Sequence, residues 1–477
     1  MKGNKLDYFR NRGTNIIADP VHKYIEFTVP RKPGEITEKD LIDNEWVQRL
    51  KWIHQLQCAL WVFPGAEHSR FTHALGSMHI ASMFAKQLHR SLKEVVKQTP
   101  SLKYVEEILR LAALLHDVGH GPFGHFFDRY YLKKYKITHE DIGQKIITTK
   151  LNKIIGNIHR SPAGKFKKKL SPEYITFLIK KPSKKDKAKK YPEWLRLIRP
   201  LFCGLYTVDN LDYVIRDSLM CGISIEPIDL ERIIYYSSIC KGGLVLHKSG
   251  KSALVRFLQT KDFLYTCIYF HRTVRSFDLH LAEIFEETLN KIFNINPLDD
   301  LHKYLHLTDL SLLGKVSEWI KGKKVREKST DSKKRKFTLG WECLLRRRKK
   351  WRFICGTTEQ QYKVSRLQRP YKQSELENKI RKISHIPYKA DIKIDMAKYD
   401  NRPVSPFAKR RSRILIYDPS KDRVSCKPLQ EDLGRSPFKT TICRLFVNTE
   451  NKEYDKRLIR TFEKKIGHIE EEEPTNI

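Results

Sequence analysis

The sequence lacks the features that mark secreted, membrane-spanning and disulfide-bonded proteins. It contains no uninterrupted apolar run of about 18 residues, the length that a membrane-spanning helix needs. Its first residues, MKGNKLDYFRNRG, include no apolar signal core. The nine cysteines are scattered and form no CxxC pair, which argues against a zinc ribbon and a disulfide framework. We therefore expect a protein of the reducing cytoplasm, or of the nucleus in a eukaryotic cell, with no membrane association.

Acidic residues are scarce relative to basic ones. The chain has 55 Asp and Glu against 92 Lys and Arg, which gives a formal net charge of +37. Such a field attracts polyanions, including nucleotides and nucleic acid. The basic residues cluster near 164–190 and 320–352, where Phe, Tyr and Trp between them could stack on bases. Nucleic acid is therefore one partner that the composition suggests, and solvated loops without a specific ligand are the alternative.

The pattern of apolar residues predicts a mainly α fold. Through most of residues 1–290 apolar side chains recur at helical spacing, as in HALGSMHIASMFAKQLHR. A lysine-rich insert at about 160–192 interrupts this pattern, and we expect it on the surface. We predict one helical domain over 1–290 and a basic helical linker over 291–350.

The C-terminal region, 351–477, has a different pattern of apolar and polar residues. Apolar and polar residues alternate in PYKADIKIDM and RSRILIYDP, and ICRLFVN is a further strand candidate. An amphipathic helix is expected over KEYDKRLIRTFEKKI. We predict a smaller α+β domain there.

Candidate metal ligands occur in LLHDVGHGPFGH, residues 114–125. His116 and Asp117 are adjacent, and neighbours on a helix point about 100° apart. Both can bind one ion only beyond the helix end or beside a bend, a freedom that Gly119 and Gly121 would supply. The alternative is that His116 caps the helix and Asp117 is solvated.

Further histidines and acids favour the metal interpretation. His73 begins a helix of small residues in GAEHSRFTHALG, and YTVDNLDYVIRDS places Asp209, Asp212 and Asp217 on a mostly apolar helix. Acids along an apolar face need partners or a cation. A shell of histidines and aspartates suits Mn, Fe, Zn or Mg better than a thiolate-seeking ion.

An ordered series of motifs resembles one known family. The series is IIADPVHKYIEF, DNEWVQRLKWIHQLQ, WVFPGAEHSRFTHALGSMH, LLHDVGHGPFGHFFD, THED, VDNLDYVIRDS and IYFHRTVRS, over about residues 16–290. It resembles the HD-domain metal-dependent phosphohydrolases, most of all the deoxynucleoside triphosphate triphosphohydrolases of the sterile-alpha-motif/HD type and their bacterial relatives. The resemblance implies an HD-domain helical core, a divalent metal cofactor, and hydrolysis of dNTPs to deoxynucleoside and triphosphate, which would lower dNTP pools.

The resemblance also assigns roles to individual residues. It implies that His73, His116, Asp117 and Asp209 bind the metal and that His120, His139 and Glu140 are catalytic, with His139 as the general acid. Substrate contacts are implied for Gln55, Leu56, Arg70, His125, Tyr213, Asp217, Lys261 and Tyr269. Taken alone, Arg70 could equally pair with a neighbouring acid.

Other positions match the family's regulatory nucleotide site or depart from its pattern. Asp43 and Gln48 match guanine-reading residues, and Lys51 stands for an arginine, which suggests a GTP or dNTP activator. Asn210 follows the last metal ligand where the vertebrate family member has a lysine, and Lys261 replaces an arginine. Because both changes weaken phosphate contacts, they leave open whether a triphosphate is the substrate.

Two further hypotheses remain beside the dNTP triphosphohydrolase. One is an HD phosphodiesterase or nuclease that acts on single-stranded nucleic acid or another nucleotide, which the lysine runs suggest. The other is a nucleic-acid-binding protein with an inactive HD fold, which the filled ligand positions disfavour. The resemblance further implies a homo-oligomer, since the family's second nucleotide pocket lies between subunits.

Overall fold

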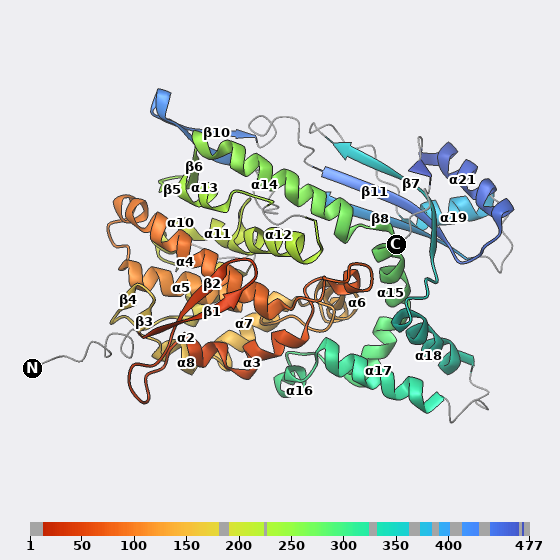
Figure 1. The fold of residues 1–477 in the computed structure, drawn as a ribbon, viewed down its shortest axis with the longest axis horizontal. Coiled ribbons are helices and arrows are strands. Elements are labelled where there is room, and N and C mark those ends of the chain that lie inside the picture. The colour runs from red at the N-terminus through yellow and green to blue at the C-terminus, as the bar shows by residue number, and fades with distance from the viewer. Residues whose placement is uncertain are drawn as a thin grey trace, which may run out of the picture.

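The computed structural model describes residues 13–180, 190–223, 227–323, 332–361, 373–383, 391–400, 413–428, 439–466 and 470–471. In Figure 1 a helical body holds the chain as far as α18, and a sheet with two helices forms the C-terminal end of the molecule. The mainly α fold with a smaller α+β part is therefore confirmed. No described helix combines the length and the apolar character that a membrane crossing requires.

Two long helices, α4 (Arg70–Val95) and α5 (Leu102–Leu115), form the centre of the helical body. α5 is buried along most of its length because the sequence LKYVEEILRLAALL has apolar side chains on nearly every face. The helix α12 (Val208–Met220) packs against α4. These helices confirm the helical patterns read from the sequence, and they bring together segments far apart in the chain.

Shorter elements surround this centre. They are α2 (Glu38–Ile42), α3 (Glu45–Gln48), α6 (His125–Tyr130), α7 (His139–Thr149), α8 (Asn152–Asn157), α9 (Pro172–Ile179), α10 (Glu193–Ile198), α11 (Pro200–Cys203) and α13 (Leu230–Tyr235). Single 3-10 turns span Arg49–Trp52, Gln57–Trp61, Leu132–Tyr135 and Lys248–Gly250, and a small hairpin joins β3 (Arg160–Ser161) to β4 (Gly164–Lys165).

The lysine-rich insert is only partly a surface feature. Its helix α9 packs against α5 and α7 and buries Ile175, Phe177 and Leu178. Residues 181–189, which hold the second lysine run of the insert, lie outside the described residues. Within the described part, the apolar side chains of α9 thus belong to the core.

An antiparallel hairpin precedes the first helices, although the sequence pattern suggested mainly helices there. β1 (Thr14–Asp19) and β2 (Lys23–Thr28) pair with Ile17 opposite Ile25. Asp19 ends β1 and His22 lies in the turn that follows, and they contact Arg216 and Asp212 of α12. The hairpin therefore contributes to the site described below.

Apolar residues recur at helical spacing over 261–293, but the structure interrupts the helix there. α14 (Lys251–Leu264) passes into a π-helical turn at Tyr265–Tyr269, and α15 (Arg272–Ile292) begins after His271, whose backbone is extended. No proline or glycine marks the interruption, so the sequence carried no break signal. The turn directs Tyr265 and Tyr269 into the cavity described below.

The segment predicted as a linker, 291–350, belongs to the helical body. It forms α16 (Leu301–Leu305), α17 (Asp309–Lys323) and α18 (Ser332–Leu345). Tyr304 and Leu312 are fully buried in the main hydrophobic core, and Trp341 donates its indole N–H to Thr288 on α15. The basic residues of this stretch suggested a helical linker, and the apolar residues between them pack into the main core.

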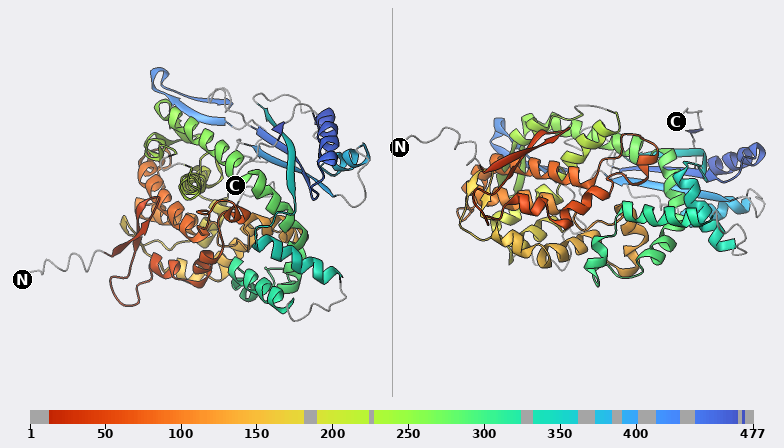
Figure 2. Two further views of the ribbon diagram at one scale, coloured as in Figure 1. Left: turned by 45° about the vertical axis from the view of Figure 1, so that its right-hand side comes forward. Right: turned by 60° about the horizontal axis from the view of Figure 1, so that its bottom comes forward.

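The C-terminal part contains an antiparallel sheet in the order β12-β7-β11-β8. Its strands are β7 (Arg352–Gln361), β8 (Ile392–Asp400), β11 (Lys439–Val447) and β12 (Glu470–Glu471), and α19 (Gln373–Ile383) and α21 (Lys452–Ile466) complete this part. Figure 2 shows the sheet and both helices at the end of the molecule opposite the β1–β2 hairpin. The predicted strands and closing helix are confirmed, whereas β7 and α19 were not anticipated.

A second sheet crosses the expected domain boundary. Its order is β10-β9-β6-β5, formed by β5 (Ser237–Cys240), β6 (Gly243–His247), β9 (Arg413–Asp418) and β10 (Arg423–Pro428). β6 and β9 pair in parallel, and Ile416 of β9 joins the main core. The C-terminal part is thus hydrogen-bonded into the helical body.

Candidate metal centre and adjoining pocket

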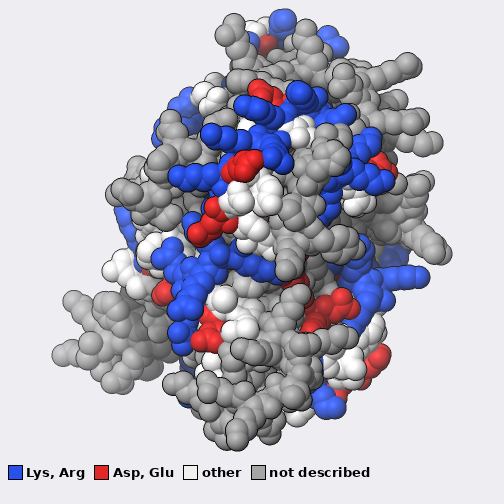
Figure 3. Space-filling view, turned by 90° about the vertical axis from the view of Figure 1, so that its right-hand side faces the viewer, with Lys and Arg blue, Asp and Glu red and all other residues white. Residues whose placement is uncertain are grey.

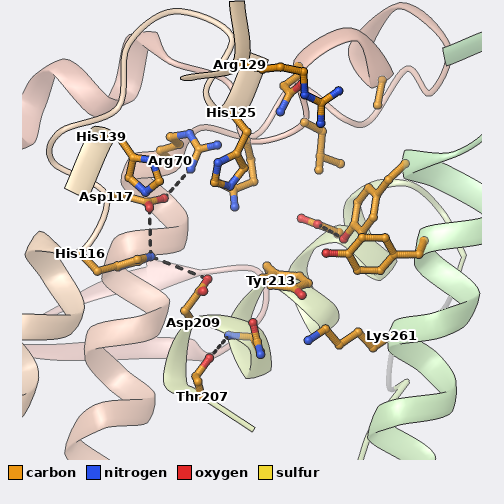
Figure 4. A pocket seen from close by; sticks show the side chains of 18 of the residues that line it. Arg70, His116, Asp117, His125, Arg129, His139, Thr207, Asp209, Tyr213 and Lys261 are labelled. Carbon is orange, nitrogen blue, oxygen red and sulfur yellow. Dashed lines mark hydrogen bonds and ion pairs between the residues drawn. The ribbon is translucent and has the colours of Figure 1, made fainter. Parts of the chain in front are cut away.

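The metal ligands expected from the resemblance converge from three helices. His73 lies on α4, His116 and Asp117 follow the end of α5, and Asp209 lies in the first turn of α12. Figure 4 shows three of them, His116, Asp117 and Asp209, on one side of a pocket. His116 is the first residue after α5 and keeps a helical backbone conformation. His116 and Asp117 therefore lie beyond the helix end, where two neighbouring residues can face one ion.

Most of the distances between the ligand atoms suit a small divalent cation. Nε2 of His73 lies 3.2 Å from Nε2 of His116 and 3.1 Å from Oδ1 of Asp209. Nε2 of His116 lies 3.4 Å from Oδ1 of Asp117 and 3.7 Å from Oδ1 of Asp209. An ion with bonds of about 2.1 Å places neighbouring ligands roughly 3.0–3.4 Å apart, a range that only the 3.7 Å separation exceeds. The donor set and its spacing therefore fit a divalent metal.

Hydrogen bonds at Nδ1 fix the ring orientations of His73 and His116. Nδ1 of His116 donates to the Ala113 carbonyl at 2.7 Å, and Nδ1 of His73 donates to Oδ2 of Asp212 at 2.8 Å. Each bond leaves Nε2 as the nitrogen directed at the metal position. Burial opposes a positive charge on His73, but its hydrogen bonds to Asp209 and Asp212 outweigh burial and raise the pKa of His73 to about 10.

Asp212 is the centre of a buried network that the sequence analysis did not assign. It accepts from Nε2 of His22 at 2.6 Å and from Nε of Arg216 at 2.9 Å. Arg216 also pairs with Asp19 at 2.9 Å, which makes it a structural ion-pair partner in this network. Burial alone would raise the pKa of Asp212, but the Arg216 charge and the histidine hydrogen bonds hold it well below its usual range. The network keeps an anion behind His73.

Two glycines allow the elements of the site to approach. A Cβ on Gly76 of α4 would lie 1.9 Å from Oδ1 of Asp212, and a Cβ on Gly119 would lie 2.0 Å from the His139 carbonyl oxygen. Any side chain at either position would push α12 or α7 away. Gly119 therefore serves close packing of the turn against α7, in addition to the bend expected from the sequence.

Asp117 is shared between the metal position and Arg70. Nη1 of Arg70 lies 2.6 Å from Oδ2 of Asp117, and both side chains are buried. Burial favours the neutral acid, but the nearby positive charges of His116 and Arg70 hold the pKa of Asp117 well below its usual value. Arg70 thus makes the acid pair that was its alternative interpretation, while it also lines the pocket in Figure 4.

A second group of histidines adjoins the metal position. His120 and His139 stack at 3.7 Å, and His125 lies 5.2 Å from His139 between ring centroids. Nδ1 of His139 contacts Oδ2 of Asp128 at 2.5 Å, an acid that the sequence analysis missed. Glu140, the third residue expected to be catalytic, directly follows His139 and lines the pocket. Because burial disfavours its charged form, the pKa of His120 is well below its usual value.

These groups open onto a cavity of about 620 Å³, within the usual size range of small-molecule sites. Of the residues expected from the resemblance, Gln55, Leu56, Arg70, His116, Asp117, His125, His139, Glu140, Asp209, Tyr213, Asp217, Lys261 and Tyr269 line it. His73 and His120 are fully buried behind this lining.

The wall away from the metal position is aromatic and holds one fixed acid. Asp217 accepts from Nε2 of His68 at 2.8 Å and from the Tyr269 hydroxyl at 2.5 Å. Tyr213 and Tyr265, which are hydrogen-bonded to each other, line the same wall. The sequence analysis missed His68 and Tyr265. Their sequence signal was weak. His68 follows a glycine by three residues and Tyr265 lies in an apolar run, and both patterns are common in ordinary protein cores.

Two cations face the cavity from opposite sides. Lys261 on α14 and Arg129 on α6 both line it, and Figure 4 shows Lys261 below Tyr213 and Arg129 near His125. Burial lowers the pKa of Lys261 to about 8, although the charge of Asp209 partly opposes this shift. Asn210 also lines the cavity. This is the position at which the resembled family's vertebrate member has a lysine.

The residues expected to form a regulatory nucleotide site lie outside this cavity lining. Asp43 is exposed and pairs with Lys39, and Gln48 donates to a backbone carbonyl at 2.7 Å. Lys51 is exposed, with its Nζ 4.7 Å from the centroid of the Phe71 ring. Any nucleotide bound by these residues would thus occupy a different place from a ligand at the metal centre.

The fold and this site resemble those of an HD domain over part of the chain. Residues 70–181 match the family model described as "HD domain", and this span contains three of the four expected metal ligands. The chain is similar to the uncharacterized protein YwfO of Bacillus subtilis, with 30% identity over 275 residues, 56% of this chain and 54% of that protein. It is also similar to the "Deoxynucleoside triphosphate triphosphohydrolase SAMHD1 homolog" of Dictyostelium discoideum, with 28% identity over 66% of this chain and 57% of that protein.

The chain is similar, too, to the "Deoxynucleoside triphosphate triphosphohydrolase SAMHD1" of Gallus gallus, with 26% identity over 62% of this chain and 50% of that protein. The chain thus spans about half the length of the curated relatives that it matches. A crystal structure of a hypothetical protein from Aquifex aeolicus superposes with a TM-score of 0.66 over 94% of this chain and 100% of that chain. At 22% identity, this likeness shows a shared fold.

Proposed function

We propose that this protein is a metal-dependent phosphohydrolase that converts deoxynucleoside triphosphates to deoxynucleoside and triphosphate and so lowers dNTP pools. One observation carries the proposal: the His73, His116, Asp117 and Asp209 ligand atoms converge at one side of a nucleotide-sized cavity. The similarity to proteins named as deoxynucleoside triphosphate triphosphohydrolases supports this substrate class.

The cavity lining suits the parts of such a substrate. Arg70, Arg129 and Lys261 offer positive charge to phosphate oxygens, and the guanidinium groups offer planar pairs of donors. The tyrosines of the aromatic wall can pack on a sugar and base, and Asp217 can accept a sugar hydroxyl. We assign the phosphate end of the ligand to the metal side and the nucleoside end to the tyrosine side.

Proton transfer is assigned to the second histidine group. A water would attack the α-phosphorus, the bond from that phosphorus to the 5′ oxygen would break, and His139 would protonate the leaving oxygen. The Asp128 contact at Nδ1 keeps Nε2 of His139 for this transfer. General acid help of this kind is worth about 10²–10⁴-fold. A divalent ion held by the four ligands would supply hydroxide near neutral pH and neutralise phosphate charge.

The deciding experiment is a panel of dNTPs and NTPs offered to the purified protein, metal by metal with Mn, Fe, Zn, Mg and Co. Products are identified by ion chromatography, because triphosphate distinguishes this reaction from stepwise removal of phosphates. Release of deoxynucleoside and triphosphate in equal amounts is expected. If no metal gives triphosphate from any dNTP, this function is wrong.

The nuclease or phosphodiesterase alternative rests on positive charge. Figure 3 shows that Lys and Arg outnumber Asp and Glu on the visible described surface at the C-terminal end of the molecule. Residues 181–189 and 324–331, within the lysine runs, lie outside the described residues. Single-stranded oligonucleotides added to the same panel test this alternative, since a nuclease would cut them without dNTP and bind them less tightly as salt increases.

We further propose that Asp43, Gln48 and Lys51 form part of an activating nucleotide site between subunits of a homo-oligomer. The exposure of Asp43 and Lys51 away from the cavity supports a separate site. The test repeats the panel with and without GTP and measures the molecular mass by sedimentation. An increase in both rate and mass with GTP is expected, and an Asp43→Ala variant should lose both effects.

A further inference from the structure

The turn between α5 and α6 presents two of the active-site histidines in an unusual backbone conformation. It carries His120 and His125, and between them Phe123 and Gly124 both have positive φ values, 59° and 51°. A phenylalanine rarely adopts this conformation, so contacts from outside the turn must stabilise it.

Asp309, the first residue of α17, supplies one of them. Its side chain is buried, and its Oδ1 accepts the Phe123 backbone N–H at 2.7 Å. Its Oδ2 accepts the backbone N–H of His54 at 2.9 Å and contacts Nδ1 of the same residue at 2.8 Å. His54 directly precedes Gln55 and Leu56 of the cavity lining. One carboxylate therefore ties the histidine turn to the segment that carries Gln55 and Leu56 of the cavity lining.

Other residues of the same segment hold the start of the turn. The Tyr304 hydroxyl donates to the Gly119 carbonyl at 2.7 Å. Arg49 donates to the His120 carbonyl at 2.7 Å and to the Leu307 carbonyl at 2.8 Å, with the Tyr304 ring 4.8 Å from its guanidinium carbon. Residues 304–309 thus contact the turn near both of its ends.

The inward position of Asp309 is not explained by helix capping. Thr308 and Ser311 already cap α17, since each side chain accepts the backbone N–H of the other at 3.2 and 2.9 Å. Asp309 is therefore free to point into the interior, where an ionised acid is costly unless hydrogen-bonded. Charge-assisted bonds to N–H groups are about twice as strong as neutral ones. This carboxylate is suited to impose one conformation on the turn.

We propose that Asp309 is a positioning residue that holds the turn carrying His120 and His125 against the edge of the cavity. It does not line the cavity, and it contacts none of the four metal ligands in any described hydrogen bond or ion pair. The inference concerns the catalytic arrangement of the proposed function and rests on it. It also gives the segment at 301–309 a role in the site, where a linker was expected.

The test compares Asp309→Asn with Asp300→Asn in the full-length protein. The amide introduced by Asp309→Asn keeps the shape of the carboxylate but cannot accept from the Phe123 and His54 backbones together, because only one of its two terminal atoms is an acceptor. Asp300 provides a matched control, because it caps α16 by accepting the Lys303 N–H at 2.9 Å and is partly exposed. Hydrogen exchange is measured by mass spectrometry on peptides that cover 118–127 and 53–57, without metal or nucleotide. Metal content and kcat are measured on the same preparations.

We expect Asp309→Asn to exchange faster in those two segments alone, to bind metal as the unmutated protein does, and to lose about tenfold or more in kcat. Asp300→Asn should match the unmutated protein in all three measurements. Equal exchange in both variants, faster exchange throughout the core, or unchanged kcat would each overturn the inference. If the unmutated protein hydrolyses no dNTP, the proposed function fails, and the exchange data still decide whether Asp309 holds the turn.

Discussion

Asp212 lies directly behind the metal-facing ring of His73, with its Oδ2 2.8 Å from Nδ1. Both side chains are completely buried. A carboxylate in this place fixes the ring orientation and makes Nε2 a stronger metal ligand. Asp212 should thus affect metal binding without touching the ion.

Asp212→Asn should weaken divalent metal binding by about 10–100-fold, because it removes the charge behind His73 but keeps a hydrogen-bond acceptor. Isothermal calorimetry with Mn²⁺ measures the affinity directly. Asp229→Asn is the control, since Asp229 only caps α13 on the surface. Equal affinities in the two variants would show that Asp212 is merely structural.

Metal binding should release a proton from His73. The pKa of this residue is raised to about 10 in the metal-free protein, so His73 is protonated at pH 7.5, whereas a metal binds the neutral ring. The stabilisation from its charged form persists at low pH and is lost only as pH rises through about 10. Calorimetry in buffers of different ionisation enthalpy should find about one proton released by this group. A release of zero at pH 7.5 would contradict the protonated state.

Substrate affinity should fall above pH 8 through Lys261. Burial lowers its pKa to about 8, with Asp209 as the opposing negative charge, so the ammonium loses its proton at much lower pH than an exposed lysine. KM for a dNTP should therefore rise between pH 7.5 and 9. Lys261→Arg should remove this rise because arginine stays charged. A rise of the same size in the arginine variant would assign the effect to another group.

Tyr269 should act on the nucleoside end of the site. Its hydroxyl holds Asp217 at 2.5 Å, together with His68. Tyr269→Phe removes one hydrogen bond to a charged group, worth about 1.5–3 kcal/mol, and should raise KM roughly tenfold with little change in kcat. Tyr235→Phe is the matched control, since Tyr235 is 70% exposed. A loss confined to kcat would place Tyr269 in the chemical step instead.

The C-terminal sheet should be needed for stability of the cavity wall. Arg275 on α15 forms a bidentate pair with Asp395 on β8 at 2.9 and 2.6 Å, and Tyr399 stacks on Tyr265 at 3.7 Å. Asp395→Asn should destabilise the protein by about 3 kcal/mol, because it leaves a largely buried guanidinium partly unpaired. Thermal unfolding measures this change.

Asp391→Asn is the control for that variant. Asp391 lies beside the start of the same strand and pairs with Arg381 at the surface, where such pairs contribute about 0–1 kcal/mol. If both variants lower the melting temperature equally, the buried Arg275–Asp395 pair contributes no more to stability than a surface pair does.

Periodicity predicted the elements that obey local rules. α4, α5 and α12 have apolar residues at helical spacing, and β8, β9 and β11 alternate as strands do. The π-helical turn at Tyr265–Tyr269 has no such signal, because its residues are as apolar as those of a continuous helix. The described part of 291–350 forms helices, and Tyr304 and Trp341 are buried there although basic residues dominate the sequence pattern.

By itself the sequence determined a helical core, a sheet-containing C-terminal part and a candidate metal-ligand set, because residue type and order are enough to select candidate ligands and helix periods. Only the tertiary structure decided which acid stands behind which histidine. Asp212 supports His73, Asp128 contacts His139, and Asp309 holds the turn, although the last two lie 11 and 186 residues from their partners in the chain. Hydrogen bonds act over about 3 Å in space, so a linear pattern does not reveal them.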